Sequence, residues 1–337
     1  MGFSALVAVS TFGVSYWLTR RLLSPSSRLF SLDHPNERSL HDRPTPRGGG
    51  IAIAAGIALG ATAIGVVYDQ HRYLPWLALG AFLIALVSFF DDRSELSPLF
   101  RFGVHGLVAV LLIDRGFVLG ALELPGVYWP FSPTLGAVLS WFLLVWLVNL
   151  YNFMDGMDGF AAGMAVIGFG CFAVLGWLAE DEGFATLSAV VTAAAGGFLL
   201  FNFPPARIFM GDVGSSLLGL LAAALALWAD REGIFPLWVG ILAFSPFIVD
   251  ATVTLLRRAV AGERVWKAHK SHFYQRLVQL GWGHRRTVLW EYVLMFACAA
   301  SAVMAVVAPP AVQWSILGLW IVLYGVLIGG VSWLEAR

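Results

Sequence analysis

Residues 149–163 read NLYNFMDGMDGFAAG and separate two long apolar runs. Asn152, Asp155 and Asp158 follow one another at intervals of three residues, and a glycine comes directly after each acid. Ionisable side chains beside hydrocarbon are costly, so two of them within four positions need a reason. Carboxylate and amide oxygens next to glycines suit a hard cation or a polar ligand at a membrane surface. An ordinary polar loop between two spans is the alternative interpretation.

The composition of the 337-residue chain is that of a protein with many membrane spans. Hydrophobic residues make up 59% and charged residues 12%, and the mean hydropathy is +0.78. Soluble domains are about one quarter charged, so a soluble fold is excluded. The formal net charge is zero, which gives no attraction toward nucleic acid. Cys171 and Cys298 lie in apolar runs and predict no disulfide framework.

Apolar runs broken by polar, Pro or Gly stretches predict a single all-α membrane domain over residues 1–337. A helix of about 20 mainly apolar residues crosses a bilayer. By this measure we expect eleven spans, near 3–22, 49–68, 76–90, 99–113, 133–150, 159–179, 184–201, 214–229, 234–256, 288–307 and 313–333. The first run has no basic residue before it, which indicates a retained span rather than a signal peptide.

The basic residues indicate the orientation of these spans. Of the 21 Lys and Arg residues, all but Arg72, Arg115 and Arg231 fall in one set of alternate loops. That set is therefore predicted to be cytoplasmic, with the N-terminus outside and the C-terminus in the cytoplasm. The opposite loops are short except for residues 114–132, where a Pro-Gly turn between β-prone runs predicts a small hairpin.

The first cytoplasmic loop combines basic residues with three glycines. Residues 31–50 read SLDHPNERSLHDRPTPRGGG. Arg38, Arg43 and Arg47, with His41, make this stretch electropositive, and the glycines at 48–50 allow backbone N–H groups to approach an anion. A loop that only sets the topology would explain the arginines but not the glycines.

Two further loops carry aspartates at the ends of spans. Asp91 and Asp92 are adjacent, and their carboxylates repel unless a cation or proton intervenes. Asp212 stands between two glycines, and Ser215 follows where a helix is expected to begin. Free N–H groups at such a helix start bind phosphate, and an Asp there would bring a divalent cation to it. The alternatives are a solvated helix end for the pair and a simple N-cap for Asp212.

The fifth loop, residues 257–287, is the longest and the most basic. An amphipathic helix on the membrane surface is predicted by the spacing of Val265, Phe273, Leu277 and Leu280. One polar face of it would carry His269, His272, Gln275 and Arg276. Attraction to lipid headgroups, about 1 kcal/mol per basic residue, is the alternative use of this loop. Asp250, inside the ninth span, is expected to pair with a cytoplasmic Arg.

The acids, histidines and Gly-rich turns fall on the predicted cytoplasmic side, whereas the outside loops carry no comparable motif. A transporter would carry polar residues at mid-membrane, where the sequence offers only His105 and Asp250. The pattern therefore favours an enzyme that joins a cytosolic polyanion to a substrate in the membrane. A transporter or flippase of lipid-linked sugars is the alternative from another class.

Five motifs, in this order between spans, resemble those of the polyprenyl-phosphate N-acetylhexosamine-1-phosphate transferases (glycosyltransferase family 4). They are DHPNERSLHDRPTPRGGG, FFDD, NFMDGMDG, NFPPARIFMGDVGSS and HKSHFYQR. The superfamily includes phospho-N-acetylmuramoyl-pentapeptide transferases and the enzymes that initiate O-antigen and teichoic-acid synthesis. The resemblance implies transfer of an N-acetylhexosamine 1-phosphate from a UDP-sugar to undecaprenyl phosphate. UMP would be released, with Mg²⁺ as the expected cofactor and Mn²⁺ as the alternative.

The resemblance also implies roles for individual positions. Asp212 resembles the magnesium ligand, with Asp92 as a second candidate ligand, and Asp91 with Asp92 resemble the essential acidic pair. The implied nucleotide- and sugar-binding residues are Asn152, Asp155, Asp158, Asn202, Phe209, His272 and Arg276, with Asp158 toward uracil and Phe209 as a stacking partner. The implied phosphate-binding residues are Arg38, Arg47, Gly49 and Ser215.

The HFYQR stretch resembles the O-antigen-initiating subgroup, because muramoyl-pentapeptide transferases carry adjacent histidines there. The resemblance implies a multi-pass enzyme of the bacterial inner membrane, surrounded by lipids, and family analogy suggests a homodimer. The muramoyl-pentapeptide and teichoic-acid branches stay open, and no motif identifies the N-acetylated hexose. A CDP-alcohol phosphotransferase fits less well, because the central motif has only two Asp. We expect a single in-line displacement instead of a covalent Asp intermediate, because two carboxylates beside an anionic acceptor would need extra shielding. A general base is less necessary, since a lipid phosphate with a second pKa of about 6 is mostly dianionic near neutral pH.

Overall fold

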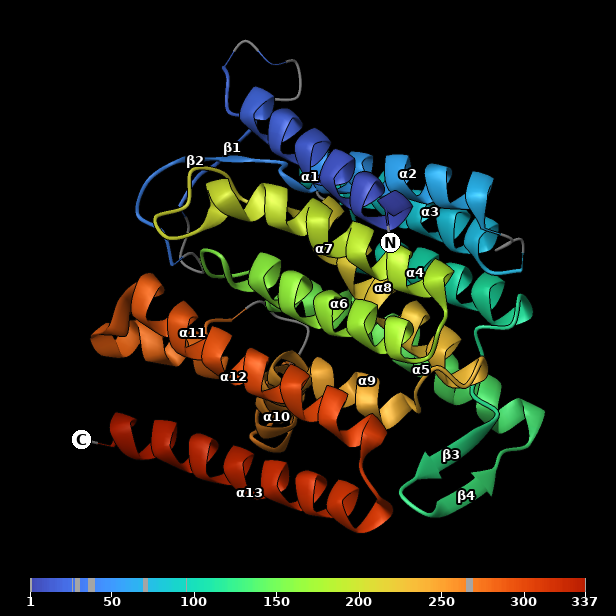
Figure 1. Ribbon diagram of the computed structural model, residues 1–337. Coiled ribbons are helices and arrows are strands. Elements are labelled where there is room, and N and C mark those ends of the chain that lie inside the picture. Colours follow the sequence, from blue (N-terminus) through green and yellow to red (C-terminus); the bar gives the residue numbers. More distant parts are fainter. Residues whose placement is uncertain are drawn as a thin grey trace.

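The computed structural model describes residues 2–25, 27, 31–35, 40–68, 72–94, 96–264 and 269–336. In that part the protein is helical apart from two small hairpins (Figure 1). The helices are α1 (Gly2–Leu22), α2 (Gly50–Val67), α3 (Leu74–Ser94), α4 (Pro98–Asp114), α5 (Pro133–Phe153), α6 (Phe160–Leu178), α7 (Glu182–Asn202), α8 (Asp212–Arg231), α9 (Leu237–Ala243), α10 (Ser245–Val260), α11 (Phe273–Leu277), the π-helix η1 (Val278–Trp282), α12 (Gly283–Val307) and α13 (Pro310–Glu335). The strands are β1 (Ser31–Asp33), β2 (Thr45–Arg47), β3 (Ala121–Leu124) and β4 (Val127–Pro130).

The described helices confirm a protein with many membrane spans. Nine are long and apolar enough to cross a bilayer, or ten if α9 and α10, which meet at 83°, form one broken span. Helix α4 falls short, because its 17 residues reach only about 26 Å at 1.5 Å per residue. The predicted total of eleven spans depends on α4 and stays a prediction.

Helix α8 lies at the centre of the bundle, and every residue from 213 to 229 is buried. A helix that is apolar on all sides needs other helices around it, and α8 contacts α2, α3, α5, α6 and α9. Gly219 permits the close approach of α5, because a methyl group there would overlap the carbonyl oxygen of Leu147. This packing fixes Asp212, the first residue of α8, at one end of the bundle.

The first loop is tied to the segment between α7 and α8. β1 pairs with β2 in antiparallel fashion, and Arg47 at the end of β2 forms a bridge with Phe209. The Gly49 N–H donates to the Phe209 carbonyl at 2.9 Å, and the Gly50 N–H donates to the Met210 carbonyl at 2.8 Å. The Gly49 N–H is thus bonded within the protein, and its predicted phosphate contact stays a prediction.

The two ends of the bundle differ. β1, β2, α11 and the C-terminus lie at one end, on the left in Figure 1. The predicted hairpin in 114–132 is confirmed as β3 and β4 at the other end, and the Trp314 indole N–H donates to the Pro125 carbonyl at its turn. Which end faces the cytoplasm stays a prediction.

The predicted surface helix of the fifth loop is wrong in the described residues. Helix α11 has only five residues, and Phe273 to Arg276 are buried. His272 has an extended backbone (φ −63°, ψ 150°) and so precedes the helix instead of lying on its polar face. Val265 lies outside the described residues.

Candidate active site

Three aspartates and two arginines meet at this end of the bundle. Arg47 Nη2 lies 2.5 Å from Asp92 Oδ1 and 2.8 Å from Asp212 Oδ1. Arg101 Nη1 lies 2.5 Å from Asp91 Oδ2 and 3.4 Å from Asp212 Oδ2. Each oxygen of Asp212 is thus paired with a different arginine. The structure therefore brings Asp212 to Asp92, which lies 120 positions earlier, and to the neighbouring Asp91. We call these three aspartates, with Arg47 and Arg101, the acid–arginine cluster.

Asp92 also caps α8, a helix other than its own. Its carboxylate accepts the N–H groups of Asp212 at 3.1 Å and Val213 at 3.5 Å. The Ser215 N–H donates to the Gly211 carbonyl at 3.2 Å. These helix-terminal donors are bonded within the protein, and the predicted phosphate site at Ser215 stays a prediction. Asp212 is the first helical residue and not the N-cap, so its carboxylate is left for the arginines.

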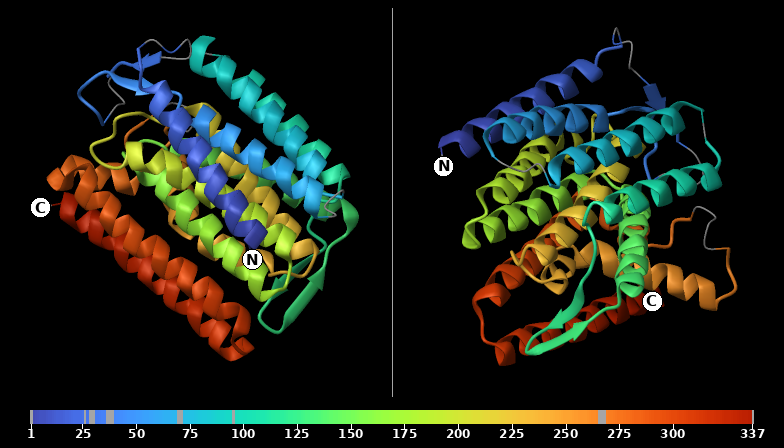
Figure 2. Two further views of the ribbon diagram at one scale, coloured as in Figure 1. Left: turned by 45° about the horizontal axis from the view of Figure 1, so that its top comes forward. Right: turned by 90° about the vertical axis from the view of Figure 1, so that its right-hand side faces the viewer.

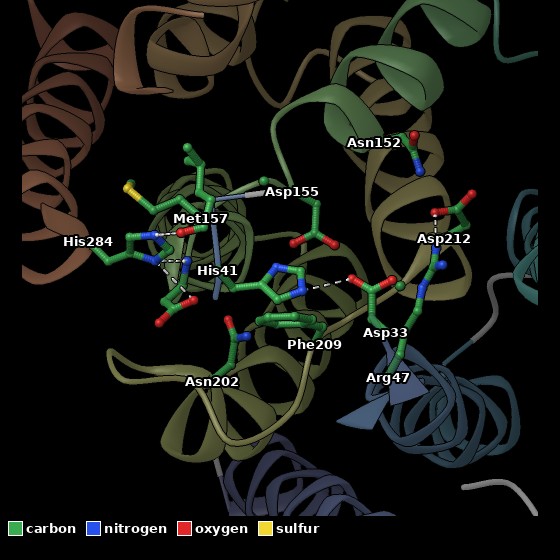
Figure 3. A pocket seen from close by; sticks show the side chains of 14 residues that line it. Asp33, His41, Arg47, Asn152, Asp155, Met157, Asn202, Phe209, Asp212 and His284 are labelled. Atoms are coloured by element: carbon green, nitrogen blue, oxygen red, sulfur yellow. Dashed lines mark hydrogen bonds and ion pairs between the residues drawn. The ribbon is translucent and has the colours of Figure 1, made fainter. Parts of the chain in front are cut away.

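A cavity of about 360 Å³ opens beside this cluster (Figure 3). The predicted site residues that line it are Arg47, Asn152, Asp155, Asp158, Asn202, Phe209 and Asp212. Figure 3 shows Arg47 and Asp212 on one side of the cavity and His284 on the other, with Asp155 between them. The volume lies in the range of small-molecule sites, roughly 300–1,000 Å³.

The two asparagines hold the walls of this cavity. The Asn152 side-chain amide donates to Ser215 Oγ at 3.0 Å. Asn202 accepts the Gly159 N–H at 3.0 Å and donates to the Ile208 carbonyl at 2.9 Å. With both ends of its amide bonded, Asn202 joins the segment before α6 to the segment before α8.

The first loop forms one wall of the cavity with two residues that were not among the predicted site residues, Asp33 and His41. The His41 ring meets the Phe209 ring edge-on, with centroids 4.7 Å apart. His41 Nε2 lies 3.5 Å from Asp33 Oδ2, and both residues line the cavity. Their place in the first motif was the available signal, whereas their position beside Phe209 follows from the pairing of β1 with β2.

His284 is a second omitted residue. Its Nδ1 lies 3.1 Å from Asp158 Oδ1, and its Nε2 lies 3.2 Å from the Leu40 carbonyl oxygen. The other oxygen of Asp158 accepts the Ala206 N–H at 2.9 Å. Asp158 is therefore held from two sides, and His284 connects α12 to the first loop across the cavity.

Arg101 is the third omitted residue. It stands ten positions after Asp91, in the first turn of the next helix. The short connection between α3 and α4 returns the chain to the level of Asp91, and this was the available signal. Arg38, predicted to bind phosphate, lies outside the described residues, so its role stays a prediction.

Arg47 contributes a positive charge to the wall of the cavity. Burial acts to lower its pKa, but the charges of Asp92 and Asp212 outweigh this and raise it above the ordinary value. Arg47 therefore stays a guanidinium cation throughout the physiological range and is suited to an anionic ligand.

His272 and Arg276 do not line the cavity, contrary to the prediction. His272 is buried, and its Nδ1 lies 3.1 Å from Asp250 Oδ1, which also accepts the Phe273 N–H at 3.0 Å. Arg276 forms an ion pair with Glu335 at the end of α13. Asp250 thus pairs with a histidine, not with the expected arginine, and both predicted ligands fix the segment after α10.

His272→Ala is therefore expected to affect stability and not substrate binding. The change leaves the Asp250 carboxylate in its buried site without one partner, so Tm should fall by about 2–4 °C. KM for the nucleotide donor should stay within about twofold of wild type, since no contact with the cavity is lost. Thermal unfolding and steady-state kinetics check this. A tenfold rise of KM at unchanged Tm would restore the ligand role.

Asp155→Asn should change the pH dependence of stability. Burial, and next the charge of Asp212, raise the pKa of the Asp155 carboxyl well above its ordinary value. The folded state then binds the proton more tightly than the unfolded state, so stability falls as pH rises from the unfolded pKa through the folded one. In EDTA, the variant should be more stable than wild type by about 1–3 °C in Tm at pH 8, and by less at pH 5.

Asp158→Asn is the matched control for this measurement. It removes an acid that is paired with His284 and bonded to the Ala206 N–H, so it should lower Tm at both pH values. An Asp155→Asn shift that is equal at pH 5 and pH 8 would contradict the assignment to ionisation.

The donor set at the cluster suits Mg²⁺, which prefers hard oxygen ligands. Asp92 Oδ1 and Asp212 Oδ1 approach the same nitrogen of Arg47, so one cation can be held by both oxygens. Among the described residues no three His, Cys, Asp or Glu side chains form a ready metal site. Two carboxylates with further oxygens from water and substrate phosphates are usual for Mg²⁺.

Known proteins are similar to this chain over most of its length. The family model described as glycosyl transferase family 4 matches residues 74–230. A probable undecaprenyl-phosphate N-acetylglucosaminyl 1-phosphate transferase of Bacillus subtilis (strain 168) is 33% identical over 282 residues, covering 82% of this chain and 78% of that protein. A decaprenyl-phosphate N-acetylglucosaminephosphotransferase of Mycobacterium tuberculosis (strain ATCC 25618 / H37Rv) is 32% identical over 334 residues, covering 88% and 82%.

A third relative comes from a different branch. The phospho-N-acetylmuramoyl-pentapeptide-transferase of Shouchella clausii (strain KSM-K16) is 32% identical over 277 residues, covering 75% of this chain and 81% of that protein. The family model runs from α3 into α8 and so includes Asp91, Asp92, Arg101 and Asp212. The chain belongs to glycosyl transferase family 4, the superfamily of polyprenyl-phosphate N-acetylhexosamine-1-phosphate transferases.

Proposed function

We propose that this protein transfers N-acetylglucosamine 1-phosphate from UDP-N-acetylglucosamine to undecaprenyl phosphate in a bacterial inner membrane. An oxygen of the acceptor phosphate bonds to the β-phosphorus of the donor, and the bond from that phosphorus to UMP breaks. The names of the Bacillus and Mycobacterium relatives support this sugar and a polyprenyl-phosphate acceptor. The observation that carries the proposal is the acid–arginine cluster at the edge of a nucleotide-sized cavity.

The protein acts mainly by placing charges, since both substrates are anions. Arg47 lines the cavity and is placed to contact the donor diphosphate. Asp158, which is paired with His284 on the side of the cavity opposite Arg47, and Phe209, which lies between the two sides, are placed to contact the uridine. Bound by Asp212 and Asp92, Mg²⁺ would supply positive charge to the diphosphate oxygens.

The contacts of Asp91 support direct transfer over a covalent aspartyl intermediate. One of its oxygens is paired with Arg101, and the other accepts the Leu96 N–H at 2.8 Å. A carboxylate with both oxygens bonded is a poor nucleophile. The acceptor phosphate, with a second pKa of about 6, is largely dianionic at neutral pH and needs little help from a base.

The test uses purified protein, undecaprenyl phosphate, Mg²⁺ and a panel of UDP-sugars, with UMP release as the readout. UMP released with UDP-N-acetylglucosamine, and only when lipid phosphate is present, is the expected result. UMP release with UDP-N-acetylmuramoyl-pentapeptide alone would favour the branch of the Shouchella relative. No UMP with any donor, from folded protein, would favour a transporter. The O-antigen pathway stays a prediction, which the glycans of a deletion strain would test.

A further inference from the structure

The donor cavity is lined on one side by a histidine at the start of α12. Of the described residues that line the cavity, His284 is the only one that follows Asp212 in the chain. The helices α1 and α2, which flank the first loop, lie on one side of the bundle, and α12 lies on the other, beyond α7 and α6 (Figure 2). His284 nevertheless contacts Leu40 of the first loop, so it joins segments from both sides of the bundle beside the cavity.

The partners of the His284 ring require a hydrogen on each of its nitrogens. Nδ1 lies 3.1 Å from Asp158 Oδ1, and Nε2 lies 3.2 Å from the Leu40 carbonyl oxygen. A carboxylate and a carbonyl only accept hydrogen bonds, so both nitrogens must donate, and only the imidazolium form has two N–H groups. Among the described residues, the Asp158 N–H is the one donor that faces the ring, at the longer distance of 3.4 Å from Nδ1.

Loss of a proton from the ring would reverse its contact with Asp158. Nδ1 would then present a lone pair to the carboxylate and accept only the Asp158 N–H. The carboxylate would turn away from the ring, while its other oxygen stays bonded to the Ala206 N–H. The orientation of Asp158 is therefore linked to the charge of His284. The other charged groups near the ring lie on the first loop and on its own helix, and they are Asp42, Arg285 and Arg286.

His284 also holds the first loop against the cavity. Leu40, whose carbonyl accepts from Nε2, is followed by His41, whose ring meets the Phe209 ring edge-on with centroids 4.7 Å apart. Leu40, His41 and Phe209 all line the cavity. The contacts of one side chain therefore connect Asp158, the first loop and, through His41, the Phe209 ring.

We infer that His284 is a positioning residue for the nucleotide part of the donor: as an imidazolium cation, it holds Asp158 and the first loop together around the nucleoside. The inference rests on the proposed function, which assigns this wall of the cavity to the uridine. Since His284 acts through Asp158 and the loop, its effect should appear in nucleotide binding. The cation is lost as pH rises through the titration of the ring, so the effect should disappear at alkaline pH.

His284→Gln tests this inference, with Arg285→Gln as the matched control. Glutamine carries no charge and cannot donate to both partners, whereas Arg285 is an exposed cation on the same helix. The Kd for UDP is measured by calorimetry without acceptor. At pH 6 it should be about five- to tenfold higher in His284→Gln than in the wild type. At pH 9, well above the ordinary histidine pKa of about 6.5, the ratio of the two Kd values should approach one.

This ratio cancels the ionisation of UDP itself, because both proteins bind the same ligand. In Arg285→Gln it should stay within about twofold of one at both pH values, as expected for an exposed charge. A His284→Gln ratio near one at pH 6, or an equal ratio at both pH values, would overturn the inference. The charge of the ring would then have no part in nucleotide binding.

His284→Lys keeps the inference testable if His284→Gln does not fold. Lysine stays charged at pH 9, since its ordinary pKa is about 10.4, so the variant should keep its UDP affinity where the wild type loses it. An equal loss in both proteins would contradict the role of the imidazolium. A wild type that binds UDP with this pH dependence but releases no UMP would contradict only the proposed function. A wild type that binds no UDP would contradict both.

Discussion

Asp212→Asn is expected to lower the rate of UMP release by about 10³-fold or more, because one substitution removes the charge at the centre of the whole cluster. Asp212 is paired with Arg47 through Oδ1 and with Arg101 through Oδ2. An amide has the same shape but offers neither the charge nor two acceptor oxygens. Both arginines and the bound cation would then lose their common partner. UMP release under saturating donor and acceptor measures the effect.

The fold should survive this substitution. The N–H groups that begin α8 are bonded to Asp92 and not to Asp212, so the helix keeps its cap. Asp230→Asn is the matched control, since it makes the same change at the other end of α8, where Asp230 accepts the Leu237 N–H at 2.8 Å. It should retain at least half of the activity. Similar losses in both variants would mean that α8 is sensitive to charge in general, against a specific role for Asp212.

Arg47→Gln is expected to lower turnover by about 10²-fold while it tightens the binding of a divalent cation. Nη2 of Arg47 lies between Asp92 Oδ1 and Asp212 Oδ1, where a cation held by both oxygens would lie. Cation and arginine repel each other and compete for these oxygens. Without the guanidinium, Mn²⁺ should bind about tenfold more tightly, a modest figure because the side chain is partly exposed.

Mn²⁺ binding is measured by the electron paramagnetic resonance signal of the free ion, in the absence of donor and acceptor. Arg207→Gln is the control, because Arg207 is an exposed arginine between α7 and α8 that stacks on Phe201. It should leave Mn²⁺ affinity within twofold of wild type. Weaker Mn²⁺ binding in Arg47→Gln would show that the guanidinium supports the cation instead of competing with it.

The sequence was informative where a charged residue interrupts an apolar segment, because such a residue is costly to bury and can be recognised from its neighbours alone. Asp155 and Asp158 interrupt apolar segments, and Asp212 follows a glycine at the start of a buried helix. Such acids need a function or a partner wherever the chain folds, so the sequence alone identifies them as candidate site residues. The β3–β4 hairpin was likewise visible from its Pro-Gly turn.

Residues whose role depends on distant partners could not be assigned in this way. Arg101 and His284 gain their meaning from Asp91 and Asp158, which the folded chain brings to them. His272 was placed on the polar face of a surface helix by its spacing, but its backbone is extended and its partner is the buried Asp250. The span count of eleven stays a prediction for a similar reason, because the short α4 and the break between α9 and α10 are not visible in the hydropathy.

The close contact between the residues that follow β2 and the start of α8 has a consequence for large-scale mutagenesis. Gly50 donates to the Met210 carbonyl, and a methyl group added at Gly50 would overlap the backbone of Gly214. Any side chain there must push the loop outward, and Arg47, three residues earlier, moves with it. A deep mutational scan for lost activity should therefore find Gly50 and Gly214 as intolerant as the acids, although neither glycine meets a substrate. In such a map, their intolerance would report the close distance between the loop and α8 and not a chemical role of the two glycines.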